Sequence, residues 1–336
     1  IRRNQLRRGE ASEAVIADLR QKVGDMTGQR GGFEAARLLA IALYQMGRRE
    51  EAMGEIEQQL RFLGVNEADL RGQFLLLLGL IGGVESGRGR LALEELVREE
   101  TRREIQRVAL YLLSRGADEG DAREAFEALL DDIFNQVNDH PLLDEILLLR
   151  SRSSLASGDL DEAARDAERM IEEFPGSPFR DHAVRLLAYL AFKREPPQFR
   201  TAANYLSRLR ADLAEGPDRA RLSVLIGDLF FLNRDFEQAL DAYSAALREG
   251  LTSRRPEVAY QRVLCAVSLD RLEEAGRIIG EGAAEGDLDP DQRWRAEWNL
   301  LSAMKQADRI EEAFERIDTI LADSDVAGVP MELRIR

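Results

Sequence analysis

Apolar residues recur every three or four positions along most of the chain, in runs separated by short polar stretches. Two clear runs are "FEAARLLAIALYQM" (33–46) and "PEVAYQRVLCAVSL" (256–269). This spacing is the period of an amphipathic α-helix. Each run is followed by a short turn and then by a second, more acidic run with the same period. The pattern therefore predicts units of helix, tight turn and helix, with no sheet.

The unit repeats along the chain. In "LASGDLDEAARDAERMIEEFPGSP" (155–178), a Gly-Asp turn is followed by an acidic helix start and an alanine. Related segments place the key alanine at Ala14, Ala52, Ala92, Ala125, Ala163, Ala202, Ala239, Ala275 and Ala313. The mean step between them is about 37 residues, which is typical of a helical repeat.

A single helix pair cannot bury its own apolar face, whereas stacked pairs can. We therefore expect a continuous α-solenoid of about nine pairs over residues 1–322, with the first pair incomplete, followed by a tail over 323–336. The alanine lets the second helix approach the first helix of its own pair. Glycine or aspartate in the turn suits a chain reversal and the cap of a new helix.

The segment "VLIGDLFFLNRDFEQALDAYSAAL" (224–247) resembles a tetratricopeptide repeat (TPR). Ile226-Gly227 and Phe230 match the first-helix pattern, and Ala239 and Tyr243 match the second. The sequence departs from the family in its longer step, in the mostly missing first-helix tryptophan, in the irregular region 80–120 and in the longer turn at 193–199. The resemblance implies a right-handed superhelix whose concave surface binds peptides or partner proteins.

In this family the first helix of each pair lines the concave groove, so the resemblance also implies the binding residues. Aligned to that helix, they are Arg37, Tyr44, Leu148, Arg152, Asp228, Phe231, Tyr260, Leu264, Trp298 and Lys305. The alternative is that several of them pack between helices. The family's clamp for a terminal carboxylate needs Lys and Asn where Val224 and Asp228 stand, so that ligand is not expected.

Three of these residues, Phe231, Tyr260 and Trp298, occupy first helices of consecutive units. Packed helices lie roughly 10 Å apart, so the rings are expected to form a ladder about 20 Å long. An extended peptide of six or seven residues spans that length at about 3.3 Å per residue.

The charge of the chain narrows the range of partners. The formal net charge is −15, which disfavours a nucleic-acid backbone and favours a peptide or protein segment that is apolar and basic. The basic stretch "IRRNQLRR" at residues 1–8 is interpreted as the solvated end of a first helix. The longest apolar run, Phe74–Val84, is too short for a membrane span of roughly 20 residues. It predicts a buried helix that ends at Gly82-Gly83.

The candidate chemistry is sparse. The chain holds two histidines, His140 and His182, and one cysteine, Cys265, which predicts no zinc site, no internal disulfide and a buried thiol. The segment "DLDPDQ" (287–292) begins like a calcium loop but has Gln292 where that loop needs glycine, so we interpret it as a helix start around Pro290. No metal or cofactor is expected.

These observations favour a non-enzymatic scaffold for protein–protein interaction. The alternative is a regulatory or sensor arm of a larger enzyme or of an envelope assembly, since the chain begins at Ile1 rather than Met. Of the 47 basic residues 44 are arginine, a bias typical of a bacterial genome. The bacterial cytoplasm and the periplasm or cell envelope both remain open, as do the partner and the oligomeric state.

Overall fold

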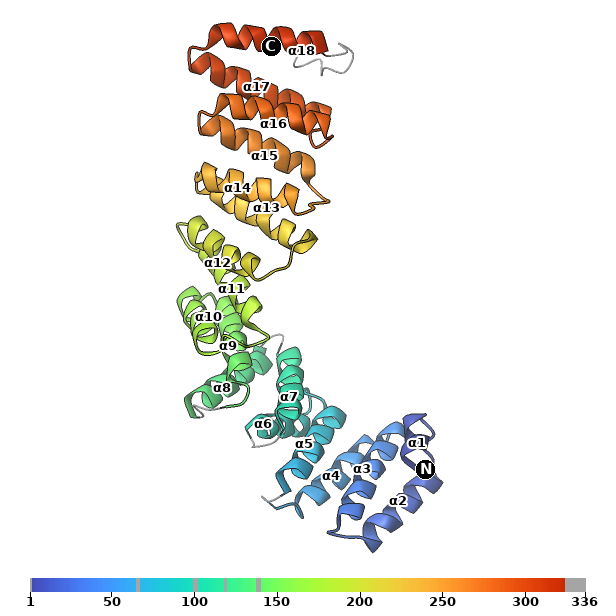
Figure 1. Cartoon of the computed structure of the whole chain (residues 1–336). Helices are drawn as coiled ribbons and strands as arrows, with labels where there is room; N and C mark the ends of the chain where they lie inside the picture. The colour runs from blue at the N-terminus through green and yellow to red at the C-terminus, as the bar shows by residue number, and fades with distance from the viewer. Residues whose placement is uncertain (1, 65–66, 99–101, 118–119, 137–139, 324–336) are drawn as a thin grey trace. The chain divides into compact units, whose positions relative to one another are not determined.

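A computed structural model of the protein describes residues 2–64, 67–98, 102–117, 120–136 and 140–323. Within these residues the regular structure is eighteen α-helices without a strand, which confirms the predicted all-α class and the TPR-like arrangement of helices (Figure 1). The chain divides into two compact units, Ile1–Ser153 (unit 1) and Ser154–Arg336 (unit 2). Each unit is described by itself, and a continuous solenoid over 1–322 stays a prediction.

The helices that begin in unit 1 are α1 (Arg2–Arg7), α2 (Glu13–Asp25), α3 (Arg30–Gln45), α4 (Arg49–Leu60), α5 (Ala68–Gly82), α6 (Gly87–Arg98), α7 (Arg103–Gly116), α8 (Gly120–Gln136) and α9 (Leu143–Ser157). Those of unit 2 are α10 (Leu160–Glu173), α11 (Arg180–Lys193), α12 (Phe199–Ala211), α13 (Pro217–Leu232), α14 (Phe236–Arg248), α15 (Arg255–Ser268), α16 (Leu272–Ala284), α17 (Pro290–Gln306) and α18 (Ile310–Asp323).

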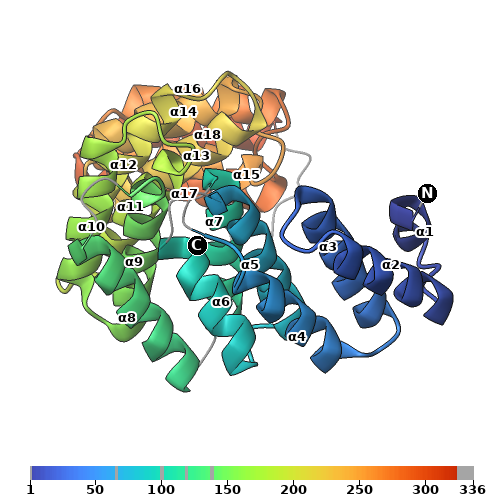
Figure 2. The same cartoon turned by 90° about the horizontal axis from the view of Figure 1, so that it is seen from below.

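Odd-numbered helices are the first helices of the predicted pairs and even-numbered helices are the second. Most helices that follow one another within a unit pack against one another, as Figure 1 shows for α11 to α18 and Figure 2 for α2 to α6. Each unit has its own apolar core, one between Leu6 and Ile146 and the other between Val184 and Met304.

Six of the turns between the first and second helix of a pair have the same backbone geometry. A residue with positive φ follows the first helix, its N–H donates to the carbonyl three residues earlier, and the next N–H donates to the carbonyl five residues earlier, at 2.8–3.2 Å. This is the hydrogen-bond pattern of a helix C-terminus closed by a left-handed residue. The six residues are Gly9, Gly47, Gly158, Arg234, Asp270 and Asp308.

The predicted alanine contact holds in most pairs. Ala52, Ala92, Ala163, Ala202, Ala239 and Ala275 are buried between helices. Ala14 is exposed, which corrects its assignment: Ile16 is buried in its place, because the turn before α2 is two residues longer than the regular turn. Ala125 and Ala313 are half-buried.

Glycines in the first helices allow the same close approach from the other side. A Cβ at Gly227 of α13 would lie 2.6 Å from the ring of Tyr243 on α14, and a Cβ at Gly79 of α5 would lie 2.3 Å from Leu93 on α6. Contacts that short do not occur between real side chains. In each of these two pairs, the helices therefore cross at a position where one of them has no side chain. The helix α5 ends at Gly82-Gly83, as predicted.

Successive pairs are also joined by arginines at the turns. Arg48, Arg194, Arg271 and Arg309 each pair with an acidic residue in the first turn of the preceding second helix, at N–O distances of 2.5–3.0 Å. The acidic partners are Glu13, Asp161, Glu237 and Glu273. The carboxylates are exposed and the arginines are partly exposed, so each pair contributes little to the stability of the fold.

Candidate protein-binding face

In unit 2 the first helices carry apolar rings and side chains along one stripe. The reference position is the residue six places before the C-cap of each first helix: Ala188, Gly227, Val263 and Leu301. Counted from it, the stripe uses offsets −3, +1 and +4, which lie on one side of a helix. We call this stripe the aromatic face. Its residues are Tyr189 and Phe192 on α11, Phe231 on α13, Tyr260 and Leu264 on α15, and Trp298 on α17.

The exposure of this set is uneven. Tyr189, Phe192 and Trp298 are exposed, with Trp298 at 40%. Phe231, Tyr260 and Leu264 are half-buried, and Phe231 and Tyr260 also pack against the core. Phe192 also packs against Phe199, with ring centroids 6.0 Å apart, so the face combines rings that are largely exposed with rings that are largely packed.

The held rings have defined partners. Phe231 packs edge-on against Phe236 of α14, with ring centroids 5.4 Å apart and an interplanar angle of 70°. The hydroxyl of Tyr260 accepts a hydrogen bond from Asn299 Nδ2 at 2.9 Å, which ties α15 to the neighbour of Trp298 on α17. The described contacts thus connect the last two steps of the predicted ladder, while Phe231 is oriented by its own helix pair.

Charged groups surround the aromatic face. Asp228 accepts a hydrogen bond from the hydroxyl of buried Tyr243 at 2.8 Å and pairs with Arg254 at 3.4 Å. Burial and the nearby Asp228 carboxylate raise the pKa of Tyr243, so this phenol stays neutral and donates. Glu257 and Lys305 are exposed at the start of α15 and the end of α17. Asp228 therefore supports the core as well as the surface.

Four predicted residues lie in unit 1. Tyr44 is 50% exposed on α3, and Arg152 is exposed on α9. Arg37 is partly covered: it donates to Gln73 of α5 and pairs with Glu34. Leu148 is buried in α9, so it packs in the helix layer and is not a surface residue, as the alternative interpretation allowed.

The sequence analysis did not assign Tyr189 and Phe192 to the face. Their pair is joined by a turn of five residues, Arg194–Gln198, where the regular turn has three. An alignment that assumes a constant turn places the wrong residues of α11 on the stripe. The signal in the sequence is Pro196-Pro197, which lengthens the turn by two residues and shifts the register of α11.

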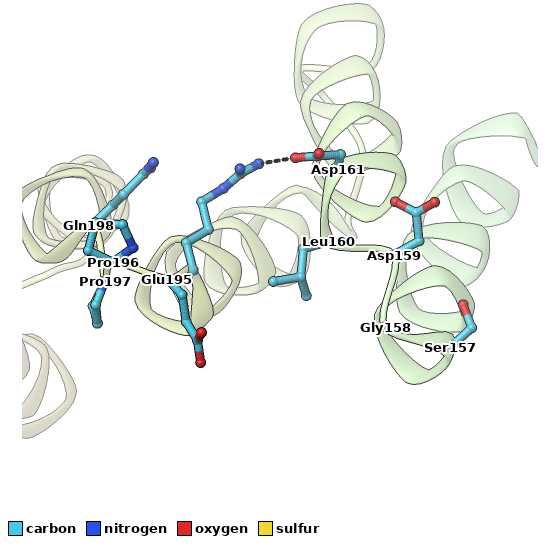
Figure 3. A pocket seen from close by; sticks show the side chains of 10 residues that line it. Ser157, Gly158, Asp159, Leu160, Asp161, Glu195, Pro196, Pro197 and Gln198 are labelled. Atoms are coloured by element: carbon cyan, nitrogen blue, oxygen red, sulfur yellow. Dashed lines mark hydrogen bonds and ion pairs between the residues drawn. The ribbon is translucent and has the colours of Figure 1, made fainter.

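One hollow of unit 2 lies among the turns that precede its second helices. It measures about 680 Å³ and lies between the turn before α10 and the turn before α12 (Figure 3). Asp159 accepts a hydrogen bond from the N–H of Glu162 at 2.9 Å, and Asp161 pairs with Arg194, so both carboxylates have structural partners. The dashed line at Asp161 in Figure 3 marks its ion pair with Arg194. The hollow is a gap between adjacent turns, without converging reactive groups.

Candidate catalytic chemistry stays sparse in the described residues. They contain no group of three or more His, Cys, Asp or Glu side chains placed to hold a metal ion. Cys265 is buried, as predicted, and burial raises the pKa of its thiol to about 12. Asp289 caps α17 by accepting from the N–H of Gln292 at 2.8 Å, which confirms the helix start at Pro290.

One histidine has a structural role in unit 1. His140 is buried and lies 2.9 Å from the Val97 carbonyl through Nε2, while Nδ1 accepts from the N–H of Leu142 at 3.1 Å. Burial lowers the pKa of His140, and the acceptor role of Nδ1 requires the neutral ring. His182 is exposed near the start of α11.

Among the helices described here, none has both the length and the apolar character that crossing a bilayer requires.

Comparison with known proteins finds no matching family model and no matching curated protein. Similar solved structures include the C-terminal part of a TPR repeat-containing protein from Cytophaga hutchinsonii, with 12% identity, a TM-score of 0.41 and coverage of 74% of this chain and 93% of that one. Yeast Tom70 has 14% identity, a TM-score of 0.34 and coverage of 91% and 62%. The TPR2AB domain of yeast Sti1, solved with pHSP90, has 14% identity, a TM-score of 0.25 and coverage of 85% and 88%. Likenesses this low carry no argument about a partner.

Proposed function

We propose that this protein is a non-enzymatic scaffold that binds a partner protein or peptide segment through the aromatic face of unit 2. The observation that carries the proposal is the run of apolar side chains at equivalent positions of α11, α13, α15 and α17. Three of these side chains are exposed, although the core of the unit is well covered. Exposed aromatic residues grouped in this way are typical of binding surfaces.

The chemistry of the face favours an apolar segment with basic flanks. Rings that are already oriented, such as Phe231 against Phe236 and Tyr260 against Asn299, lose little side-chain entropy on binding. The formal net charge of −15 would speed the approach of a basic ligand, and Glu257 is exposed at the edge of the face. Arg37, Tyr44 and Arg152 in unit 1, and Asp228 and Lys305 in unit 2, are proposed only as peripheral contacts.

For the test, peptides that bind the full chain are first selected from a random display library. Binding is then measured with a Tyr189→Ala/Trp298→Ala variant, which removes two exposed rings and should leave the fold intact. We expect affinity to fall about tenfold or more, since truncating a binding hot spot costs about 1–2 kcal/mol or more. The melting temperature should be nearly unchanged.

The matched control is Leu225→Ala. Leu225 is exposed on α13 but lies outside the stripe. It should keep full affinity. If peptides bind equally well to both variants, the binding surface lies elsewhere. If the selected peptides are rich in Asp and Glu, the basic preference is wrong while the aromatic face still stands.

A further inference from the structure

A single carboxylate lies among the positions of the aromatic face. At offsets −3, +1 and +4 of α11, α13, α15 and α17, all of them described residues, the one acidic residue is Asp228, at offset +1 of α13. The first helices before and after α13 have Tyr189 and Leu264 at that offset. The basic residues at these offsets are Arg185 on α11 and Lys305 on α17. A cationic group of a ligand is therefore attracted at α13 and repelled at α11 and α17.

Asp228 is held in place by the core of unit 2. Its Oδ1 accepts a hydrogen bond from the hydroxyl of Tyr243 at 2.8 Å, and Tyr243 is buried. The Asp228 side chain is nevertheless 32% exposed, so a ligand can reach it. An acceptor that is already oriented in this way loses little conformational freedom when a ligand binds to it.

The second oxygen of Asp228 has a weak internal partner. Nη1 of Arg254 lies 3.4 Å from Oδ2, whereas hydrogen bonds between charged groups are usually about 2.7–2.9 Å long. The next residue gives the contrast, because Arg255 donates twice to the buried carboxylate of Asp287, at 2.6 Å each. The side chain of Arg254 is 52% exposed. Arg255 therefore fixes the start of α15, while Arg254 can be exchanged for another cation.

We infer that Asp228 selects the basic ligand of the aromatic face by binding the guanidinium of a ligand arginine in place of Arg254. The inference rests on the proposed function and identifies the residue on which its basic preference depends. Arg254 shows that a guanidinium fits at Oδ2. Displacing it costs little, because an exposed ion pair is weak. Phe231 follows Asp228 by three residues on the same side of α13, where it can contact an apolar neighbour of the ligand arginine.

The test uses the arginine-containing peptide from the display library that binds the wild-type chain most tightly. Each arginine is replaced in turn with citrulline, which has nearly the same shape without the charge. One replacement should lower the affinity for the wild-type chain about tenfold and should leave the affinity for Asp228→Asn unchanged. Asparagine keeps an oxygen that can accept from Tyr243, so this variant should stay folded, and its melting temperature verifies this. The matched control is Asp218→Asn, the same change at an exposed position of α13, which should keep the tenfold difference.

A second variant removes the competing cation and leaves Asp228 intact. Arg254→Gln should raise the affinity for the arginine peptide about two- to fivefold and leave the affinity for the citrulline peptide unchanged. Its matched control is Arg234→Gln, which removes the same charge from another residue with positive φ and should change neither affinity.

Three results would overturn the inference: no selected peptide contains arginine, the citrulline peptides all bind as tightly as the parent, or Asp228→Asn retains the difference between them. The Tyr189→Ala/Trp298→Ala measurement decides the proposed function separately. If that double variant loses binding while Asp228→Asn retains the difference, the aromatic face stands and the role of Asp228 does not.

Discussion

Units 1 and 2 are built from the same helix pair, but their first helices are joined differently. In unit 1, polar pairs bridge successive first helices: Arg37 donates to Gln73 between α3 and α5, and Arg107 pairs with Glu145 between α7 and α9. Glu145 is so far buried that the pKa of its carboxyl is raised despite the nearby arginine. In unit 2, the corresponding side carries rings, and Tyr260 and Asn299 form one neutral bridge there.

This difference shows that the first helices of the same scaffold can either hold neighbouring pairs together or present side chains to a ligand. Side chains paired across neighbouring helices stabilise the stack and are no longer free for a ligand. Rings packed against their own pair stabilise it through burial and still present an edge or a face to solvent. The proposed binding function therefore belongs to unit 2.

The largest effect on stability is expected from substitution of the glycines at which two helices cross. In unit 1, a Cβ at Gly89 would lie 2.2 Å from the carbonyl oxygen of Gly83, so backbone meets backbone. Gly89→Ala should cost about 3 kcal/mol, the upper end of overpacking costs, because no side chain can move aside. Chemical unfolding followed by hydrogen exchange measures the loss. The control Gly54→Ala, which meets nothing within 4 Å in α4, should be neutral or stabilising.

In unit 2 the obstacle is a side chain. Gly227→Ala would bring a Cβ to 2.6 Å from the Tyr243 ring, which is buried but can tilt. We expect a loss of about 1–2 kcal/mol after the helix-forming advantage of alanine is included. Hydrogen exchange should quicken in α13 to α15. Gly280→Ala on α16 is the matched control, since a Cβ there meets nothing within 4 Å. If Gly227→Ala quickened hydrogen exchange in unit 1 as much as in unit 2, the two units would unfold together.

Acid should affect unit 1 through His140. Its pKa in the folded chain lies below the ordinary value of 6.5, so below about pH 6.5 the unfolded chain binds the proton more readily. Stability is therefore full above that pH and is lost as the pH falls towards the lower, folded pKa. Unfolding curves at pH 7.5 and 5.5 should show a smaller difference in His140→Gln than in the wild type. His182→Gln, at an exposed position, should retain the wild-type difference.

The smallest expected effect lies in the turns. Arg234 holds a positive φ of 62° where Gly158 stands in the equivalent turn. Arg234→Gly should stabilise unit 2 by about 0.5–1 kcal/mol, because glycine adopts this conformation without strain. Gly158→Ala should destabilise by a similar amount. Thermal unfolding of the two variants measures both, and equal melting temperatures would indicate that the turns carry no strain.

Short-range signals in the sequence were enough to place the helices. Pro290 marks the start of α17, Gly82-Gly83 ends α5, and the turn residues Gly47 and Gly158 have the positive φ that their type favours. Each of these features depends on hydrogen bonds and sterics within about five residues. The pattern of apolar residues every three or four positions likewise predicted the helical class and which side of most helices is buried.

Tertiary packing decided which side chains remain at the surface. Leu148 is buried, Arg37 is engaged by a residue 36 positions away, and Tyr189 and Phe192 joined the aromatic face because a longer turn shifts α11. Ile16 takes the buried position predicted for Ala14 because the turn before α2 is also longer. Exposure depends on what the neighbouring helix covers, and that neighbour lies about one repeat away in the chain, beyond the reach of local rules.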